Sequence, residues 1–167
     1  MKIQLDSFTV RHPKIPPPHA ADMVLHLAVA LERYHAAGVH LQASVMLETR
    51  RFVLAWRAVD AEAAAMLDTN RATEMGAESL LLLVLHATKG WTVRRRLQRG
   101  AFADWLLSSP DGLLIALETS GTNDGSAEQR MKEKLSQISG CVAAPTRVAG
   151  VVRFLDPRSI VEEFKDG

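Results

Sequence analysis

The sequence predicts a single domain of the α/β (α+β) class, in which a mixed β-sheet is flanked by helices. The first observation is the order of elements from residue 73 onward, which reads helix, strand, strand, strand, helix, strand. The second is the length of 167 residues, which suffices for one domain with a sizeable core. The third is the composition, because 47% hydrophobic and 23% charged residues are ordinary for a globular protein.

The C-terminal part of the chain supplies the ordered series. The elements that it predicts are a helix over 73–88, strands over 91–97, 102–107 and 113–118, a helix over 127–138, a strand over 148–155 and a short helix from Pro157. Gly90 stands where a helix C-cap belongs, and Pro157 suits the first turn of a helix. The turn residues Pro110-Asp111-Gly112 predict that the strands on either side pair antiparallel.

The N-terminal part predicts a strand–helix–hairpin extension. Its elements are a strand over 3–10, a helix over 20–37, and two strands over 39–47 and 52–59 that pair as a hairpin around 48–51. The prolines between 13 and 18 predict an extended connector before the helix. We therefore expect one domain over 1–167, with an N-terminal layer over 1–60 and a core over 73–155.

Composition and motifs exclude several classes of function. The net charge of +1 gives no global attraction to nucleic acid or membrane, so a basic surface must be local. Cys141 is the only cysteine, which excludes an internal disulfide and a cysteine-based zinc site. No zinc-hydrolase histidine spacing, dinucleotide-binding glycine pattern or serine-hydrolase elbow occurs. The first residues lack a signal-peptide core, and Leu80–Leu85 is far shorter than the ~20 residues of a membrane span, so we expect a cytoplasmic protein.

Two carboxylates on neighbouring strands point to a divalent-metal site. Asp104 lies on the strand 102–107, and Glu118 ends the apolar strand 113–118, with Ser120 on the same strand face. Antiparallel pairing of these strands would bring Asp104 and Glu118 side by side. Burying a carboxylate is costly unless it finds a partner, a metal or water. The alternative is that Glu118 reaches water at a strand end and Asp104 is an edge charge.

The flanking helices add a third acid and a cation. Glu78 lies on the apolar stripe of the helix 73–88, where a charge needs a partner, and Glu74 lies one turn earlier, nearer the edge. The alternative for Glu78 is a salt bridge to an arginine of 94–96. Lys134 borders the apolar stripe of the helix 127–138 and can direct its ammonium into a cleft. The alternative for Lys134 is a solvated side chain.

This set of elements and acids resembles the core of the restriction-endonuclease-like, PD-(D/E)xK superfamily over about residues 73–155. The resemblance implies that Asp104 and Glu118 hold Mg²⁺ or Mn²⁺ with the Thr119 carbonyl, and that Glu78 or Glu74 joins them. The motif lysine is replaced by Ser120, and no proline precedes Asp104. Superfamily members are known to move the lysine to the following helix, where Lys134 lies.

The resemblance implies a metal-dependent nuclease that cleaves DNA or RNA. Arg94, Arg96 and Arg99 would contact nucleic-acid phosphates, although a charged edge strand that resists aggregation has the same pattern. The N-terminal layer would then select the substrate or form a homodimer. The rival hypothesis is a catalytically inactive domain of the same fold that binds a protein partner as an adaptor subunit. The missing motif lysine and the low net charge favour this rival.

Overall fold

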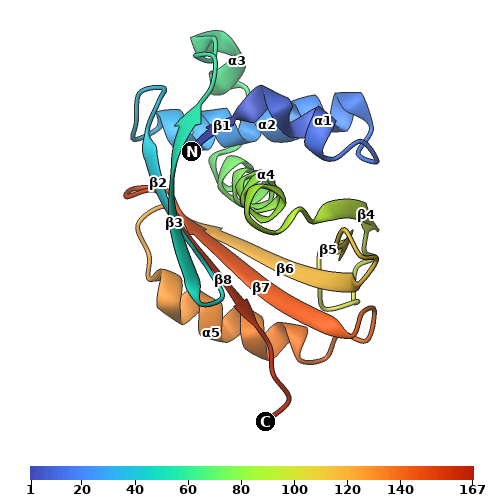
Figure 1. Cartoon of the computed structure of the whole chain (residues 1–167). Coiled ribbons are helices and arrows are strands. Elements are labelled where there is room, and N and C mark those ends of the chain that lie inside the picture. The colour runs from blue at the N-terminus through green and yellow to red at the C-terminus, as the bar shows by residue number, and fades with distance from the viewer.

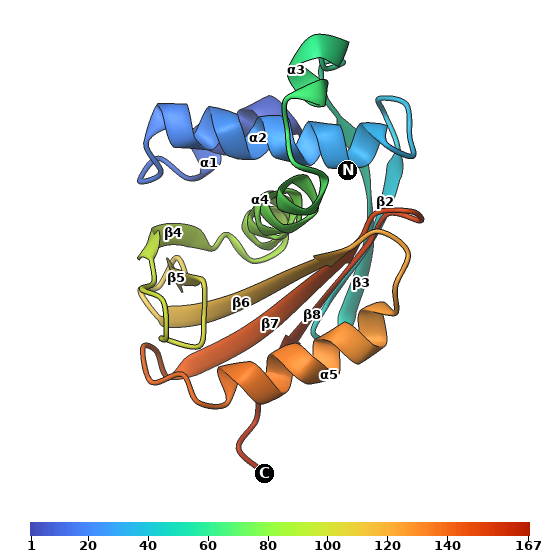
Figure 2. The same ribbon diagram turned by 180° about the vertical axis from the view of Figure 1, so that it is seen from behind.

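The computed structural model describes all 167 residues and confirms the α/β class with a mixed sheet. Eight strands form one sheet in the order β1-β3-β2-β8-β7-β6-β5-β4. Helix α4 packs on one face of this sheet beneath α2, and α5 packs on the other face (Figures 1 and 2). The helices are α1 (Phe8–Arg11), α2 (Pro17–Glu32), α3 (Ala61–Ala65), α4 (Thr69–Lys89) and α5 (Ala127–Ile138), after a 3-10 turn at Leu5–Ser7. The strands are β1 (Lys2–Gln4), β2 (His40–Val45), β3 (Glu48–Ala55), β4 (Thr92–Arg96), β5 (Trp105–Ser108), β6 (Leu114–Thr122), β7 (Thr146–Arg153) and β8 (Arg158–Glu163).

The series predicted from residue 73 onward is confirmed as α4, β4, β5, β6, α5, β7. Side-chain caps explain the helix starts: Asp68 accepts from the Arg71 amide before α4, and Ser126 accepts from the Gln129 amide before α5. Helix α4 ends at Gly90, whose φ of 69° lies in the left-handed region that glycine tolerates. Pairing is antiparallel from β4 to β6 and parallel between β6 and β7.

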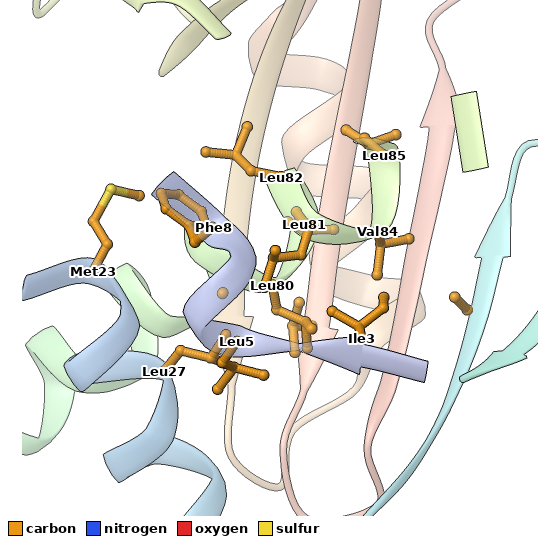
Figure 3. Close-up of a cluster of buried hydrophobic side chains, with 14 of the residues drawn as sticks. Ile3, Leu5, Phe8, Met23, Leu27, Leu80, Leu81, Leu82, Val84 and Leu85 are labelled. Atoms are coloured by element: carbon orange, nitrogen blue, oxygen red, sulfur yellow. The ribbon is translucent and has the colours of Figure 1, made fainter. Parts of the chain in front are cut away.

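The predicted strand over 3–10 is wrong beyond its first residues. Lys2–Gln4 pairs with β3, and the chain then coils through the 3-10 turn into α1. Leu5 and Phe8 are both fully buried, and their three-residue spacing lets one helical turn present both to the same core. Figure 3 shows them facing α4 beside Met23 and Leu27 of α2. Helix α2 begins earlier and ends earlier than the predicted range 20–37, with Pro17 in its first turn.

Three further expectations are corrected. The hairpin turns at Met46, which has a φ of 58°, so residues 48–51 belong to β3 rather than to the turn. The short helix α3 was not anticipated. The predicted helix after Pro157 is strand β8, in which Ser159 and Val161 alternate as buried residues. Because β8 pairs with both β7 and β2, it joins the N-terminal strands and the core in one sheet.

The edge of β6 positions the functional site. Strand β5 pairs only with residues 114–117 of β6, so residues 118–122 have no neighbouring strand on that side. Gly121 lets α4 approach closely here, since a Cβ at this position would lie 2.5 Å from the Thr73 carbonyl oxygen. The open edge of β6 thus lies between α4 on one face and α5 on the other. None of the helices combines the length and apolar character that crossing a membrane requires.

Candidate active site

A groove of about 540 Å³ follows the open edge of β6 and contains no hydrophobic side chain. Five acidic and two basic residues line it: Glu74, Glu78, Asp104, Glu118, Asp124, Arg130 and Lys134. The remaining lining is neutral and polar or glycine, from β6, from Asn123 directly after it, and from the start of α4. The groove therefore brings together the predicted acids, Lys134, Thr119 and Ser120.

Asp104 lies immediately before β5, not on a strand as predicted, because β5 begins only at Trp105. Its Oδ2 accepts hydrogen bonds from the Thr119 amide at 2.9 Å and from Thr119 Oγ1 at 2.7 Å. This carboxylate thus takes the place that a paired strand would have beside Thr119. Its second oxygen, Oδ1, has no hydrogen-bond partner and remains available at the groove.

Glu118 is buried within β6 rather than at its end, since the strand continues to Thr122. Its side chain lies on the same strand face as Ala116, which packs with residues of α5, whereas Leu117 belongs to the core around α4. Burial, and after it the neighbouring charge of Asp104, raise the pKa of the Glu118 carboxyl to about 7. Its Oε2 has no hydrogen-bond partner.

Lys134 pairs directly with Glu118. Its Nζ lies 2.5 Å from Glu118 Oε1 and 3.2 Å from Gln137 Oε1. The ammonium lowers the pKa of Glu118, but its effect is smaller than that of burial. Lys134 is half-buried on α5, the helix whose apolar stripe buries Met131 and Ile138.

Glu78 is tied to Arg96 and Trp105, and an arginine partner was one of the two arrangements expected. Arg96 donates to both Glu78 oxygens, at 2.8 and 3.2 Å, and Trp105 Nε1 donates to Oε2 at 3.2 Å. The Arg96 guanidinium also stacks over the Trp105 ring, 4.8 Å from its centroid. Arg96 and Trp105 already use most of the hydrogen-bonding capacity of Glu78. Glu78 therefore adds negative charge to the groove and is less suited to coordinate a metal ion. Glu74 lines the groove from an exposed position and has no such partner.

Ser120 lines the groove on the strand face of Glu118, as expected from the period of the strand. Of the three predicted phosphate-binding arginines, Arg96 is the one bound to Glu78. Arg94 and Arg99 are exposed, form no ion pair and lie outside the groove lining.

Sequence reasoning missed the far end of the groove. Arg33, the residue that caps the end of α2, donates to Asn123 Oδ1 at 2.8 Å, and Thr73 Oγ1 of α4 donates to the same oxygen at 3.3 Å. These contacts attach the end of β6 to two helices. Arg130 also lines the groove from the first half of α5. Nothing local in the sequence indicates these contacts, because the partners are up to 90 residues apart.

The donor set at Asp104 and Glu118 suits a hard divalent cation. No cluster of three or more His, Cys, Asp or Glu side chains is arranged to hold a metal ion. Two carboxylate oxygens are nevertheless free. The Thr119 carbonyl faces the same open edge as the Thr119 amide, which donates a hydrogen bond to Asp104. Two carboxylates and a carbonyl, completed by water, are an oxygen set that Mg²⁺ accepts.

No protein-family model, curated protein or solved structure matches the chain.

Proposed function

We propose that the protein is a metal-dependent phosphodiesterase that hydrolyses DNA or RNA. The observation that carries the proposal is the meeting of Asp104, Glu118 and Lys134 in one polar groove at the open edge of β6. The series of elements from α4 to β7, with acids at these positions, is similar to the PD-(D/E)xK core and supports the same activity. A reducing, cytoplasmic environment is part of the proposal and fits the single buried cysteine.

Asp104, Glu118 and the Thr119 carbonyl would hold Mg²⁺ or Mn²⁺. When bound, the ion would lower the pKa of water and neutralise charge on the phosphodiester. Thr119 fixes one Asp104 oxygen through two hydrogen bonds and leaves the other directed to the groove. The two carboxylates are therefore held in place before any ligand enters, which limits reorganisation during the reaction.

Lys134 would supply the positive charge that the Ser120 position lacks. Its ammonium already lies at Glu118, so a short rotation can direct a donor to a phosphate oxygen or to the attacking water. Ser120 would donate a hydrogen bond to the phosphate or to a neighbouring water. Arg130, at the outer part of the same helix, is suited to a phosphate oxygen further along the groove.

The Lys134–Glu118 ion pair is also the observation that favours the rival function, a catalytically inactive adaptor. The pair neutralises Glu118 without a metal, so the fold does not need an ion to be stable. An adaptor would bind a protein partner and would not respond to Mg²⁺ or Mn²⁺.

Cleavage assays decide between the two functions. Purified protein with Mg²⁺ or Mn²⁺ is expected to nick or degrade single- or double-stranded DNA or RNA. Asp104→Ala and Glu118→Ala should each abolish cleavage without unfolding the chain, a loss of roughly a thousandfold or more. Lys134→Ala should cost less than either. Absence of cleavage and of metal-induced thermal stabilisation in the wild type would favour the adaptor, and activity that survives Asp104→Ala would contradict the assigned site.

A further inference from the structure

A second, smaller pocket of about 190 Å³ lies on the other side of the contact between Glu78, Arg96 and Trp105. Basic side chains from two distant segments line it. Lys14 and His19 come from the N-terminal part of the chain, and Arg95 and Arg96 come from β4. Trp105 and Val93 contribute apolar surface, and no carboxylate belongs to the lining. The wall of the pocket is therefore mostly apolar, while the charged groups around it are opposite in sign to most of those in the groove.

The chain segments that build this pocket are fixed. Ile15 is buried, and its amide donates to the His12 carbonyl at 3.1 Å, which holds the connector against the core. The prolines at 16–18 then restrict the backbone at the start of α2. On the other side, β4 has an irregularity between Val93 and Arg95, which redirects its side chains. The cations therefore meet through the fold and not through sequence proximity.

The positive charge in the pocket is not used by the protein itself. Lys14, His19 and Arg95 form no hydrogen bond or ion pair in the structure, whereas Arg96 is shared with Glu78. Glu78 is the one acid bound to a lining residue, and Lys14, His19 and Arg95 have no acidic partner. Unpaired basic groups around a concave site favour an anion that brings several acceptor oxygens.

The position of the pocket relative to the groove identifies the anion. Trp105 follows Asp104 in the chain, and Arg96 binds Glu78, so the two sites share one wall. The groove itself carries five acids against two bases and repels a polyanion before a metal binds. A nucleic acid must therefore draw its binding free energy from cations beside the groove.

We propose that the Lys14–His19–Arg95 pocket binds a backbone phosphate of the nucleic-acid substrate, next to the phosphate that is cleaved. This inference rests on the proposed function. It also assigns the N-terminal layer a role, since Lys14 and His19 carry substrate contacts from outside the catalytic core.

Equilibrium binding to a fluorescent oligonucleotide in EDTA, without cleavage, tests the pocket. The variants are Lys14→Glu and Arg95→Glu, with Arg57→Glu as a control of equal charge change. Arg57 is exposed and follows β3, far from β4 in the strand order. Each pocket variant should weaken binding at least about tenfold and reduce the slope of log affinity against log salt by about one, with Arg57→Glu close to the wild type.

Binding by both pocket variants that equals binding by Arg57→Glu would overturn the inference. If the wild type also cleaves nucleic acid in that case, the proposed function stands and the pocket is wrong. If the wild type binds through Lys14 and Arg95 but never cleaves, the pocket is supported and the catalytic function fails. Lys14→Ala and Arg95→Gln, which do not reverse charge, should give smaller losses in the same order, and circular-dichroism melts check that every variant is folded.

Discussion

Lys134 reaches from α5 to Glu118 of β6 and places its ammonium 2.5 Å from a buried carboxylate oxygen. The ion pair does not return the Glu118 pKa to its ordinary value of 4.5, because burial and the charge of Asp104 still raise it to about 7. The carboxyl therefore changes charge near neutral pH, in the centre of the groove. This makes Glu118 the residue through which pH acts on the site.

Glu118→Gln is expected to stabilise the protein at pH 8 and to remove one component of its pH dependence. A carboxyl whose pKa is raised on folding stabilises the fold below its unfolded pKa of 4.5, and this stability is lost as pH rises through about 7. This change in the Glu118 pKa corresponds to roughly 3 kcal/mol of unfolding free energy, and loss of the Lys134 pair reduces the gain. Urea unfolding at pH 5 and pH 8 measures the effect.

Glu74→Gln is the matched control, because it neutralises an exposed carboxylate in the same groove. It should leave the pH dependence of unfolding close to that of the wild type. A wild type and a Glu118→Gln variant with parallel pH profiles would show that the Glu118 pKa is not raised.

Thr119→Val should loosen Asp104 and reduce cleavage. The substitution removes the Oγ1 hydrogen bond of 2.7 Å but keeps the amide bond of 2.9 Å. A hydrogen bond to a charged group contributes about 1.5–3 kcal/mol, so we expect a loss of that order in stability and at least about tenfold in cleavage rate. Thr119→Ser keeps the donor and should recover most of both. A loss for serine as large as that for valine would contradict the role given to the Oγ1 hydrogen bond, because serine keeps this donor.

Gly121→Ala should push α4 away from β6 and lower the stability of the protein next to the groove. An alanine Cβ would lie 2.5 Å from the Thr73 carbonyl oxygen and 2.9 Å from the Ala77 Cβ, so the helix must move. Such overpacking costs about 1–3 kcal/mol. Gly140→Ala is the control, since its Cβ would meet only the exposed Phe102 ring at 3.3 Å. Thermal melts of the two variants give the comparison, and equal stability would contradict the close approach.

The core of the fold could be predicted because its signals are local. Helix α5 has the predicted bounds, since a serine cap and an amphipathic stripe define them. The sequence after Pro157 predicts a helix, whereas residues 158–163 form strand β8, because proline suits the start of either element. The sequence also predicts too early an end for β6. Its residues 119–122 are polar or glycine and therefore resemble a loop, but they continue the strand and line the groove.

The site could be predicted only in part, because some of its contacts are not local in the sequence. Asp104 and Glu118 were visible as acids next to apolar strands, and the arginine partner of Glu78 was one of two expected alternatives. The convergence of Lys14 and His19 with Arg95 depends on how the N-terminal connector crosses to β4. A contact over about 80 residues leaves no periodic or spacing signal in the sequence.

A buried histidine supplies a second pH dependence, opposite in sign to that of Glu118. His12 is fully buried, its Nε2 donates to the Leu82 carbonyl at 3.1 Å, and its Nδ1 accepts from the Val93 amide at 3.3 Å. The neutral ring thus links α4 to β4. Burial is the largest cause that lowers the His12 pKa to about 4. The hydrogen bond to the Leu82 carbonyl opposes this change, and the nearby charges of His86 and Arg11 add to it.

His12→Asn is expected to remove the loss of stability that this histidine causes in acid. A histidine whose pKa falls on folding stabilises the fold above its unfolded pKa of 6.5, and this stability is lost as pH falls toward about 4. The shift corresponds to roughly 3 kcal/mol, similar in size to the Glu118 effect and opposite in direction over much of the same range. The wild type should therefore show a nearly flat profile between pH 4.5 and 6.5.

The Glu118→Gln background separates the two effects. In that background, unfolding free energy should fall by about 3 kcal/mol from pH 6.5 to pH 4, because the opposing carboxyl is gone. Adding His12→Asn should flatten the profile, although the double variant is less stable at pH 7, since asparagine cannot reach both the Leu82 carbonyl and the Val93 amide. A Glu118→Gln profile that is already flat would mean that His12 binds a proton in the folded protein as readily as in the unfolded chain. The link between α4 and β4 would then not depend on a neutral ring.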